Sequence, residues 1–436
     1  MSPRHPLLLL SLVLCLSANA RGEDPKDELH DFIRRGMPAW SLTGLALAVV
    51  KEDKVVFLRG YGLSDVRTGA PVDEHTVFQI GSCSKPLAAS AVAILVQDGR
   101  VGWDTPLVGR WPAFRVADPA VTKQATFRDA LCHRTGVGKD ESALYYQMPA
   151  TRAELLARLP EVRQAAPFRT EWRYSNLMYA AAGRAVEEVT GESWDEYLSK
   201  RLFRPLGMTR TFTSVKPLAG AKNVAVPHVR LKDKTFATGF ADQDNIGPAG
   251  ALSSSASDLS RWLLMMVNGG RFDGKQVLKP ELVREMIRPQ ILMPFADPAH
   301  GEHVFNAYGL GLMLCDYQGM RIAKHAGMAG HTLAMLGFVP ERRVGVAVLT
   351  NHRPCLFHYA VFRRAIDLYC GEELPVDLDS ANRKLLAQHM ARLEEEIKRR
   401  ADARDPGKKP SLPLGRYAGT YEREYGLRAH LEAGPK

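Results

Sequence analysis

The chain has 436 residues, 45% of them hydrophobic and 24% charged, a composition typical of a soluble globular protein with one large or two medium domains. The formal net charge is +10, and the lysines and arginines are scattered along the chain. This pattern predicts a basic surface suited to an anionic environment such as a cell wall. It excludes the clustered basic stripe that a nucleic-acid-binding protein uses.

Residues 1–20 have the features of a secretory signal peptide. Arg4 precedes an apolar core, which is followed by the small-residue triplet that ends at Ala20. The apolar core is too short to span a bilayer, so we expect cleavage after Ala20. The prediction is an exported protein, periplasmic or secreted, with no membrane span in the mature chain and a bacterial envelope as its setting.

Two pairs of short, apolar and β-branched segments predict two antiparallel hairpins. The first pair spans 42–50 and 54–62, and the second spans 332–340 and 344–351. The chain between them is largely helical. This order predicts one α+β domain over residues 24–375, with an antiparallel sheet formed by both ends of the domain, flanked by helices and a largely helical subdomain.

Four of the intervening helices carry recognisable end signals. They are expected at 151–159, 175–191, 193–203 and 257–270. Thr151 with Glu154, and Ser193 with Glu196, have the spacing of capping boxes. Glycines at the far ends of 175–191 and 257–270 are typical helix stops.

The composition changes after Cys370. Residues 376–413 predict a charged surface or connecting helix followed by a linker, with Leu386, Met390, Leu393 and Ile397 at helical spacing. Residues 414–436 alternate like strands, but about twenty residues cannot form a stable sheet alone.

Cysteine and histidine usage points to no cofactor and no metal. Five cysteines remain after the signal peptide, an odd number without a CxxC pair, so a disulfide framework is not expected. His300 and His303 lie in a polar loop, where a histidine pair is more often solvated than metal-bound.

The segment 84–99 is apolar on nearly every face, which predicts a buried helix that starts just after Ser82. Ser82 and Lys85 are three residues apart and share one face. A buried lysine near a helix N-terminus is pushed towards its neutral form, and a neutral amine can take the proton of a serine nucleophile. A catalytic serine, a redox thiol at Cys83 and an ordinary polar helix start all remain open from these residues alone, although Cys83 should point into packing.

Three motifs in order narrow these alternatives. Ser82 and Lys85 form S-x-x-K, Tyr174 and Asn176 form Y-x-N, and "HAG" from His325 to Gly327 has the form of a basic residue-x-Gly strand motif. The set resembles the serine β-lactamase and penicillin-binding protein superfamily, closest to its class C-like branch of D-aminopeptidases, esterases and DD-carboxypeptidases. The segments "LCHRTGV" and "PAGALSSSASDLSRWL" are similar to flanking segments of that family, over about residues 30–370.

The resemblance implies a β-lactamase/transpeptidase-like fold and a role for each motif residue. Ser82 would form an acyl-enzyme, Lys85 would ease removal of its proton, and Tyr174, its phenol held near two cations, would relay protons. Asn176 would position the substrate amide. The backbone N–H groups of Ser82 and Met328 would form the oxyanion hole.

For the third motif the resemblance implies that Gly327 keeps its strand bare for substrate, and that His325 lies where most relatives carry lysine. Histidine is mostly neutral at pH 7, which disfavours β-lactams and free carboxylates and favours esters, amides or peptides of D-amino acids. His133 is expected to be structural. The expected partners are then a small molecule or peptide, such as one derived from peptidoglycan, and no nucleic acid.

Two alternatives stay beside this interpretation. The chain could be a β-lactamase or DD-carboxypeptidase acting on stem peptides, or a wall-binding protein that has lost catalysis. The segment "YAGTYEREYG" resembles the opening strand of a β-barrel that many relatives carry after the catalytic domain. The sequence leaves the oligomeric state and the substrate unknown.

Overall fold

The computed structural model describes residues 24–138, 141–147, 151–231, 234–294, 305–371, 378–403, 413–423 and 427–431. The predicted signal peptide, and the histidine pair at 300 and 303, lie outside these ranges. Within them, every helix is too short or too polar to cross a membrane.

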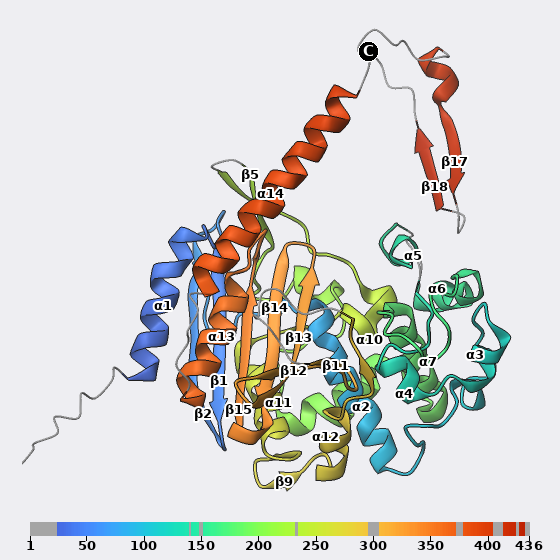
Figure 1. Ribbon diagram of the computed structural model, residues 1–436, viewed down its shortest axis with the longest axis horizontal. Coiled ribbons are helices and arrows are strands. Elements are labelled where there is room, and N and C mark those ends of the chain that lie inside the picture. Colours follow the sequence, from blue (N-terminus) through green and yellow to red (C-terminus); the bar gives the residue numbers. More distant parts are fainter. Residues whose placement is uncertain are drawn as a thin grey trace, which may run out of the picture.

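Nine strands form one antiparallel sheet that runs through the centre of the molecule (Figure 1). In spatial order they are β10 (Ile291–Leu292), β11 (Asn306–Tyr308), β12 (Met313–Tyr317), β13 (Met320–Ala329), β14 (Thr332–Val339), β15 (Val344–Thr350), β1 (Gly44–Lys51), β2 (Lys54–Asp65) and β3 (Ala70–Pro71). Both predicted hairpins are present, as β1–β2 and β14–β15. Ala48 of β1 pairs with Leu58 of β2 on one side and Ala347 of β15 on the other. The prediction that both ends of the domain share one sheet is confirmed.

The alternation of side chains along β1 divides the core into two layers. Leu45, Leu47 and Val49 pack into one apolar cluster with α1 (Pro25–Ala39) and α13 (Phe357–Cys370). Ala46, Ala48 and Val50 belong to the other cluster, with α2 (Ser84–Gln97) and α11 (Ala256–Val267). Because successive strand residues point to opposite faces, one strand serves both layers. Figure 1 shows α1 and α13 on one face and α11 on the other.

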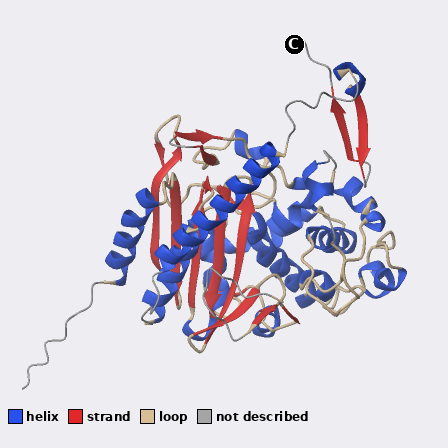
Figure 2. Ribbon diagram, turned by 45° about the horizontal axis from the view of Figure 1, so that its top comes forward, coloured by secondary structure: helices blue, strands red, loops and turns tan. Residues whose placement is uncertain are grey.

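The helical part of the fold lies beside the edge of the sheet (Figure 2). Its helices are α3 (Pro119–Gln124), α4 (Phe127–Leu131), α5 (Ser142–Gln147), α6 (Arg152–Ala157), α7 (Asn176–Thr190), α8 (Trp194–Leu198), α9 (Arg204–Leu206) and α10 (Gly247–Gly250). Helix α12 (Pro280–Met286) contacts α2. The capping boxes at Thr151 and Ser193 are formed as predicted. Helix α7 ends at Gly191, whose φ of 73° suits glycine.

Short strand pairs complete the described chain. They are β4 (Phe78–Gln79) with β7 (Ser253–Ser254), β8 (Arg271–Phe272) with β9 (Lys275–Gln276), and the trio β16 (His352–Arg353), β5 (His228–Leu231) and β6 (Lys234–Ala237). The five cysteines of the described ranges form no disulfide with one another.

The C-terminal segment consists of a long helix and a separate hairpin. Helix α14 (Leu378–Asp402) begins against α13 and then runs beyond the sheet. Strands β17 (Gly419–Arg423) and β18 (Leu427–Leu431) pair with each other as a two-stranded sheet. In both views this hairpin stands apart from the nine-stranded sheet (Figures 1 and 2). That it is the opening of a β-barrel stays a prediction.

Candidate active site

Ser82 lies in a tight 3-10 turn, Gly81–Cys83, that leads directly into the buried helix α2. Gly81 has a φ of +51°, and a Cβ atom there would lie 2.4 Å from the carbonyl oxygen of Met328. Only glycine therefore allows the turn to sit this close to strand β13. Cys83 is buried and its Sγ donates to the carbonyl of His325, 3.1 Å away. Cys83 points into packing, as predicted.

Lys85 contacts three oxygen atoms in the interior. Its Nζ donates to Ser82 Oγ at 3.2 Å, to Asn176 Oδ1 at 2.7 Å and to the carbonyl of Ala249 at 2.9 Å. Its side chain is fully buried, and burial lowers the pKa of Lys85 to about 7, with the nearby carboxyl of Glu141 opposing the shift. The ammonium form can donate all three bonds. With a pKa of about 7, a substantial fraction of Lys85 is a free amine at neutral pH, as its burial near a helix N-terminus predicted.

Tyr174 reaches the same serine from the start of α7. Its hydroxyl donates to Ser82 Oγ at 2.7 Å, so Ser82 Oγ has two proton-bearing neighbours. Burial raises the pKa of Tyr174 well above its usual value, so the group is a phenol and a proton donor. We expected two cations near this phenol. Lys85 Nζ does lie 4.5 Å from the centre of the Tyr174 ring. His325, the second expected cation, is neutral and so supplies no charge.

Asn176 lies at the N-terminus of α7 and is held by contacts within the protein. Its Oδ1 accepts from Lys85, and its Nδ2 donates to the hydroxyl of Tyr145 at 2.9 Å. These bonds make Asn176 an orienting partner of Lys85. Contact with a substrate amide stays a prediction.

Glu141 is a part of the site that sequence reasoning missed. The residue is 5% exposed, and its carboxyl accepts from Ser175 Oγ at 2.6 Å and from the backbone N–H of Asn176 at 2.5 Å. Burial raises the pKa of Glu141 to about 7. The residue fixes the start of α7 and places a titratable charge near Lys85. It lies in no recognisable motif, so the sequence carried no signal for it.

His325 lies on β13 and is 1% exposed. Its Nδ1 is 2.6 Å from the carbonyl of Ala326, which can only accept, so Nδ1 carries the proton. Its Nε2 then accepts from the hydroxyl of Tyr308 at 2.8 Å. Burial and the nearby Lys85 lower the pKa of His325 to about 3, so the ring is neutral. The ring is occupied by protein partners on both nitrogens, which leaves it no free nitrogen to meet a substrate directly.

Gly327 and Met328 bring β13 against the serine turn. A Cβ atom on Gly327 would lie 1.9 Å from the carbonyl oxygen of Ile80. The absence of a side chain at Gly327 therefore leaves room for the turn that carries Ser82. That Gly327 also leaves room for substrate stays a prediction. The backbone of Met328 adjoins Gly81, which supports the expectation that its N–H and that of Ser82 face one oxyanion.

His133 contacts Ser175 and Tyr174 at the start of α7. It is buried, its Nδ1 accepts from the backbone N–H of Ser175 at 3.1 Å, and its ring centre lies 4.4 Å from that of Tyr174. Burial lowers its pKa well below its usual value. These contacts agree with the structural role expected for His133.

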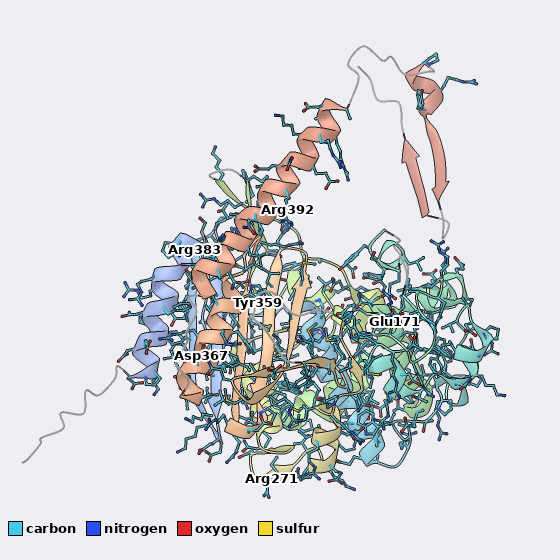
Figure 3. All side chains as sticks on the ribbon, in the orientation of Figure 1. Glu171, Arg271, Tyr359, Asp367, Arg383 and Arg392 are labelled. Carbon is cyan, nitrogen blue, oxygen red and sulfur yellow. The ribbon has the colours of Figure 1, made fainter. Side chains whose placement is uncertain are left out.

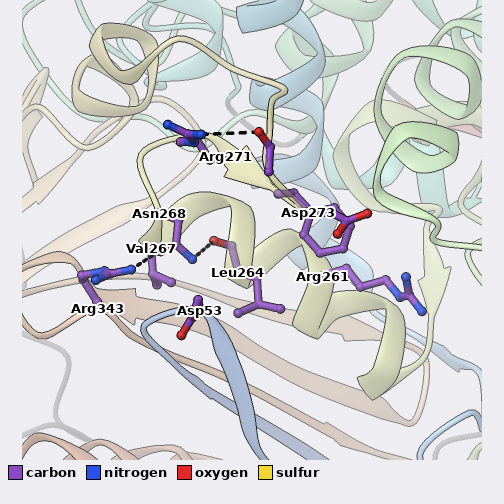
Figure 4. Close-up of a pocket in the computed structure, with 10 residues that line it drawn as sticks. Asp53, Arg261, Leu264, Val267, Asn268, Arg271, Asp273 and Arg343 are labelled. Atoms are coloured by element: carbon purple, nitrogen blue, oxygen red, sulfur yellow. Dashed lines mark hydrogen bonds between the residues drawn. The ribbon is translucent and has the colours of Figure 1, made fainter.

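Of two pockets in the described chain, one is lined by Ser82 and the other contains none of the candidate catalytic residues. A cavity of about 580 Å³ starts at Ser82, Gly327 and Met328. Another, of about 800 Å³, lies between the β1–β2 turn and α11, lined by Asp53, Arg261 and Arg343 among others (Figure 4). None of the candidate catalytic residues lines the second pocket. Among the described residues, we find no group of three or more His, Cys, Asp or Glu side chains placed to hold a metal ion.

A serine with a buried lysine and a tyrosine on its oxygen, set at the head of a buried helix, defines the serine hydrolase class. The family model for Beta-lactamase matches residues 29–368, and the chain belongs to that family. The family and fold predicted from the three motifs are thereby confirmed.

The relatives include enzymes and penicillin-binding proteins. The chain is 27% identical over 427 residues to Unguisins hydrolase ungD of Aspergillus violaceofuscus, covering 89% of this chain and 73% of that protein. It is 30% identical over 340 residues to Penicillin-binding protein 4 of Amycolatopsis lactamdurans, covering 76% and 87%. The solved octameric penicillin-binding protein homologue from Pyrococcus abyssi shares the fold, with a TM-score of 0.71 at 24% identity over 80% of this chain and 78% of that one.

Proposed function

We propose that this protein is an exported serine hydrolase that cleaves an amide or ester through an acyl-enzyme on Ser82. The observation that carries the proposal is that Lys85 Nζ lies 3.2 Å, and the hydroxyl oxygen of Tyr174 2.7 Å, from Ser82 Oγ. Esters, and amides or peptides of D-amino acids, are the substrate class that we favour over β-lactams.

The first half-reaction begins with the free amine of Lys85, which takes the proton of Ser82 as Oγ attacks the substrate carbonyl carbon. The negative charge moves to the carbonyl oxygen, where the N–H groups of Ser82 and Met328 stabilise it. As the bond to the leaving group breaks, the phenol of Tyr174 gives the leaving atom its proton. The proton held by Lys85 then restores the phenol.

The second half-reaction is the hydrolysis of the acyl-enzyme. A water molecule attacks the acyl carbon and loses its proton to the Lys85 and Tyr174 pair, and Ser82 leaves as the alcohol. Water is the only co-reactant, so the chain's own side chains account for every proton.

The neutrality of His325 supports the preference for uncharged substrates. A buried neutral ring bonded to Tyr308 offers no fixed positive charge to a substrate carboxylate. The second candidate is a β-lactamase or DD-carboxypeptidase. It is favoured by the similarity to Penicillin-binding protein 4 and by Arg353, a cation that lines the cavity next to Ser82. The third, a wall-binding protein without catalysis, has no support in a site with these contacts.

The test is covalent labelling combined with a substrate panel. Short neutral esters, D-amino amides, D-Ala-D-Ala peptides and a chromogenic cephalosporin are compared by kcat/KM, and an acylating fluorescent probe marks the nucleophile. We expect labelling that Ser82→Ala removes, while Cys83→Ala and Ser142→Ala, the latter an exposed serine of α5, keep it. Labelling that survives Ser82→Ala would overturn the proposal.

Export is proposed from residues 1–20 alone. Expression of the full chain in a bacterial host should deliver activity to the periplasm or medium, and deletion of residues 2–20 should keep it in the cytoplasm. Equal distribution of the two forms would contradict this proposal.

A further inference from the structure

Part of the lining of the cavity at Ser82 comes from residues that lie after 29–368, the segment matched by the family model. Besides Ser82, its lining comes from Val229 of β5, from β13, β14 and His331 between them, from residues within 353–359, and from Leu386 and Met390 of α14. The family match ends at residue 368, whereas α14 begins at Leu378. The cavity is thus completed by a helix that lies after the segment matched by the family model.

The first half of α14, which lines the cavity, is anchored to the rest of the domain by side-chain contacts. The indole Nε1 of Trp40 donates to Asp379 Oδ1 at 2.5 Å, and Asn382 is buried. Leu386 packs against the apolar cluster of α1 and α13. In contrast, Ile397 in the second half is 59% exposed. Figure 3 shows Arg383 and Arg392 along α14, with Tyr359 of α13 beneath the helix.

The lining of the cavity is mainly apolar. Its apolar side chains include Val229, Leu333, Leu356, Tyr359, Leu386 and Met390. Arg353 and His331 add polar groups to the same lining. A concave apolar pocket with a few polar groups is the usual form of a small-molecule site. Because the nucleophile lies in this lining, the occupant is part of the molecule whose carbonyl Ser82 attacks.

We propose that the cavity binds an apolar chain of the substrate, and that Leu386 and Met390 of α14 determine how long that chain can be. The proposal rests on the proposed function and names its substrate class: esters or amides with an apolar group of several carbons. The group is attached either to the acyl carbon or to the leaving atom, and the two arms of the test distinguish these cases.

The catalytic test compares two ester series. One varies the acyl chain from acetate to octanoate with p-nitrophenol as leaving group, and the other varies the alcohol chain of acetate esters. In at least one series we expect kcat/KM to rise with length, by up to roughly fourfold for each buried methylene. In the double variant Leu386→Ala/Met390→Ala the rise should be largely lost, mainly through KM.

Two control variants separate the effect of the cavity-lining side chains of α14 from general effects on folding. Ile397→Ala changes an exposed side chain on the same helix and should leave both series unchanged. Leu386→Met conserves apolar volume and should keep most of the length preference. A length preference unaltered in the double variant, or absent from both series in the wild type, would overturn the proposal.

A binding measurement keeps the pocket testable apart from catalysis. Ser82→Ala protein should bind hexyl acetate or ethyl hexanoate in calorimetry at least tenfold more tightly than the same protein carrying Leu386→Ala/Met390→Ala. Equal affinities would overturn the pocket proposal. Absence of ester turnover in the wild type would count against the proposed function. The binding comparison would still show whether Leu386 and Met390 form a pocket for the apolar chain.

Discussion

Lys85 Nζ lies 2.7 Å from Asn176 Oδ1 and 3.2 Å from Ser82 Oγ, so the same buried amine joins the first two motifs of the site. Burial lowers the pKa of Lys85 from its usual 10.5 to about 7, and the charged form is the one that burial disfavours. The pH at which the enzyme becomes active therefore reports on this residue.

The first prediction is a pH profile. Lys85 accepts the serine proton only as a free amine, so kcat/KM for a neutral ester should rise with pH through about 7 and level off above it. The measurement is initial rate from pH 5 to 9. A profile that is flat across this range would mean that the base has another identity.

The second prediction concerns Glu141, whose negative charge raises the pKa of Lys85 against the effect of burial. Glu141→Gln removes that charge, so the rise in kcat/KM should move to lower pH. Glu196→Gln, an exposed carboxylate in the capping box of α8, is the matched control and should leave the profile in place. An unshifted rise in Glu141→Gln would show that Glu141 has only a structural role.

The third prediction treats Lys85 and Tyr174 as one proton-handling unit. Each single change, Lys85→Ala or Tyr174→Phe, should lower kcat by orders of magnitude, and the double variant should lose little more than the worse single one. Losses that multiply would show that the two residues act in separate steps.

The fourth prediction concerns His325, a neutral ring enclosed near Lys85. His325→Gln keeps a neutral polar group beside Tyr308 and should retain ester hydrolysis within about tenfold. His325→Lys buries a second cation near the first, and should lower the free energy of unfolding by about 2 kcal/mol or more. Chemical denaturation of the two variants measures the difference. Equal stability of the two variants would contradict the account of a site that excludes charge at this position.

The fifth prediction concerns the C-terminal hairpin. Because β17 and β18 pair with each other and not with the nine-stranded sheet, ending the chain after Asp402 should leave ester turnover and the melting temperature almost unchanged. This form retains α14. A fall of more than about 5 °C, roughly 1–2 kcal/mol for a large domain, would show that the hairpin is integral to the fold.

Local signals in the sequence predicted local structure well. Thr151 with Glu154 capped α6, and Ser82 with Lys85 met as three-residue spacing requires. That both ends of the domain share one sheet was also predicted, because short apolar strand pairs lie at both ends with helices between them, and β1 does pair with β15.

What the sequence did not show depends on contacts between distant segments. Glu141 reaches Ser175, 34 residues away, and Tyr308 reaches His325, 17 residues away, from positions without a motif. Leu386 and Met390 were predicted to lie on a surface or connecting helix, but their packing over the cavity depends on where α14 docks. No periodicity in the helix itself specifies that position.

The most direct measurement is mass spectrometry of the enzyme trapped with a slow ester, read together with steady-state turnover. We predict an added acyl mass on the peptide that contains Ser82, and a loss of at least a thousandfold in kcat for Ser82→Ala with an unchanged melting temperature. An acyl group on another residue, or a Ser82→Ala variant with a tenth of the wild-type activity, would contradict it.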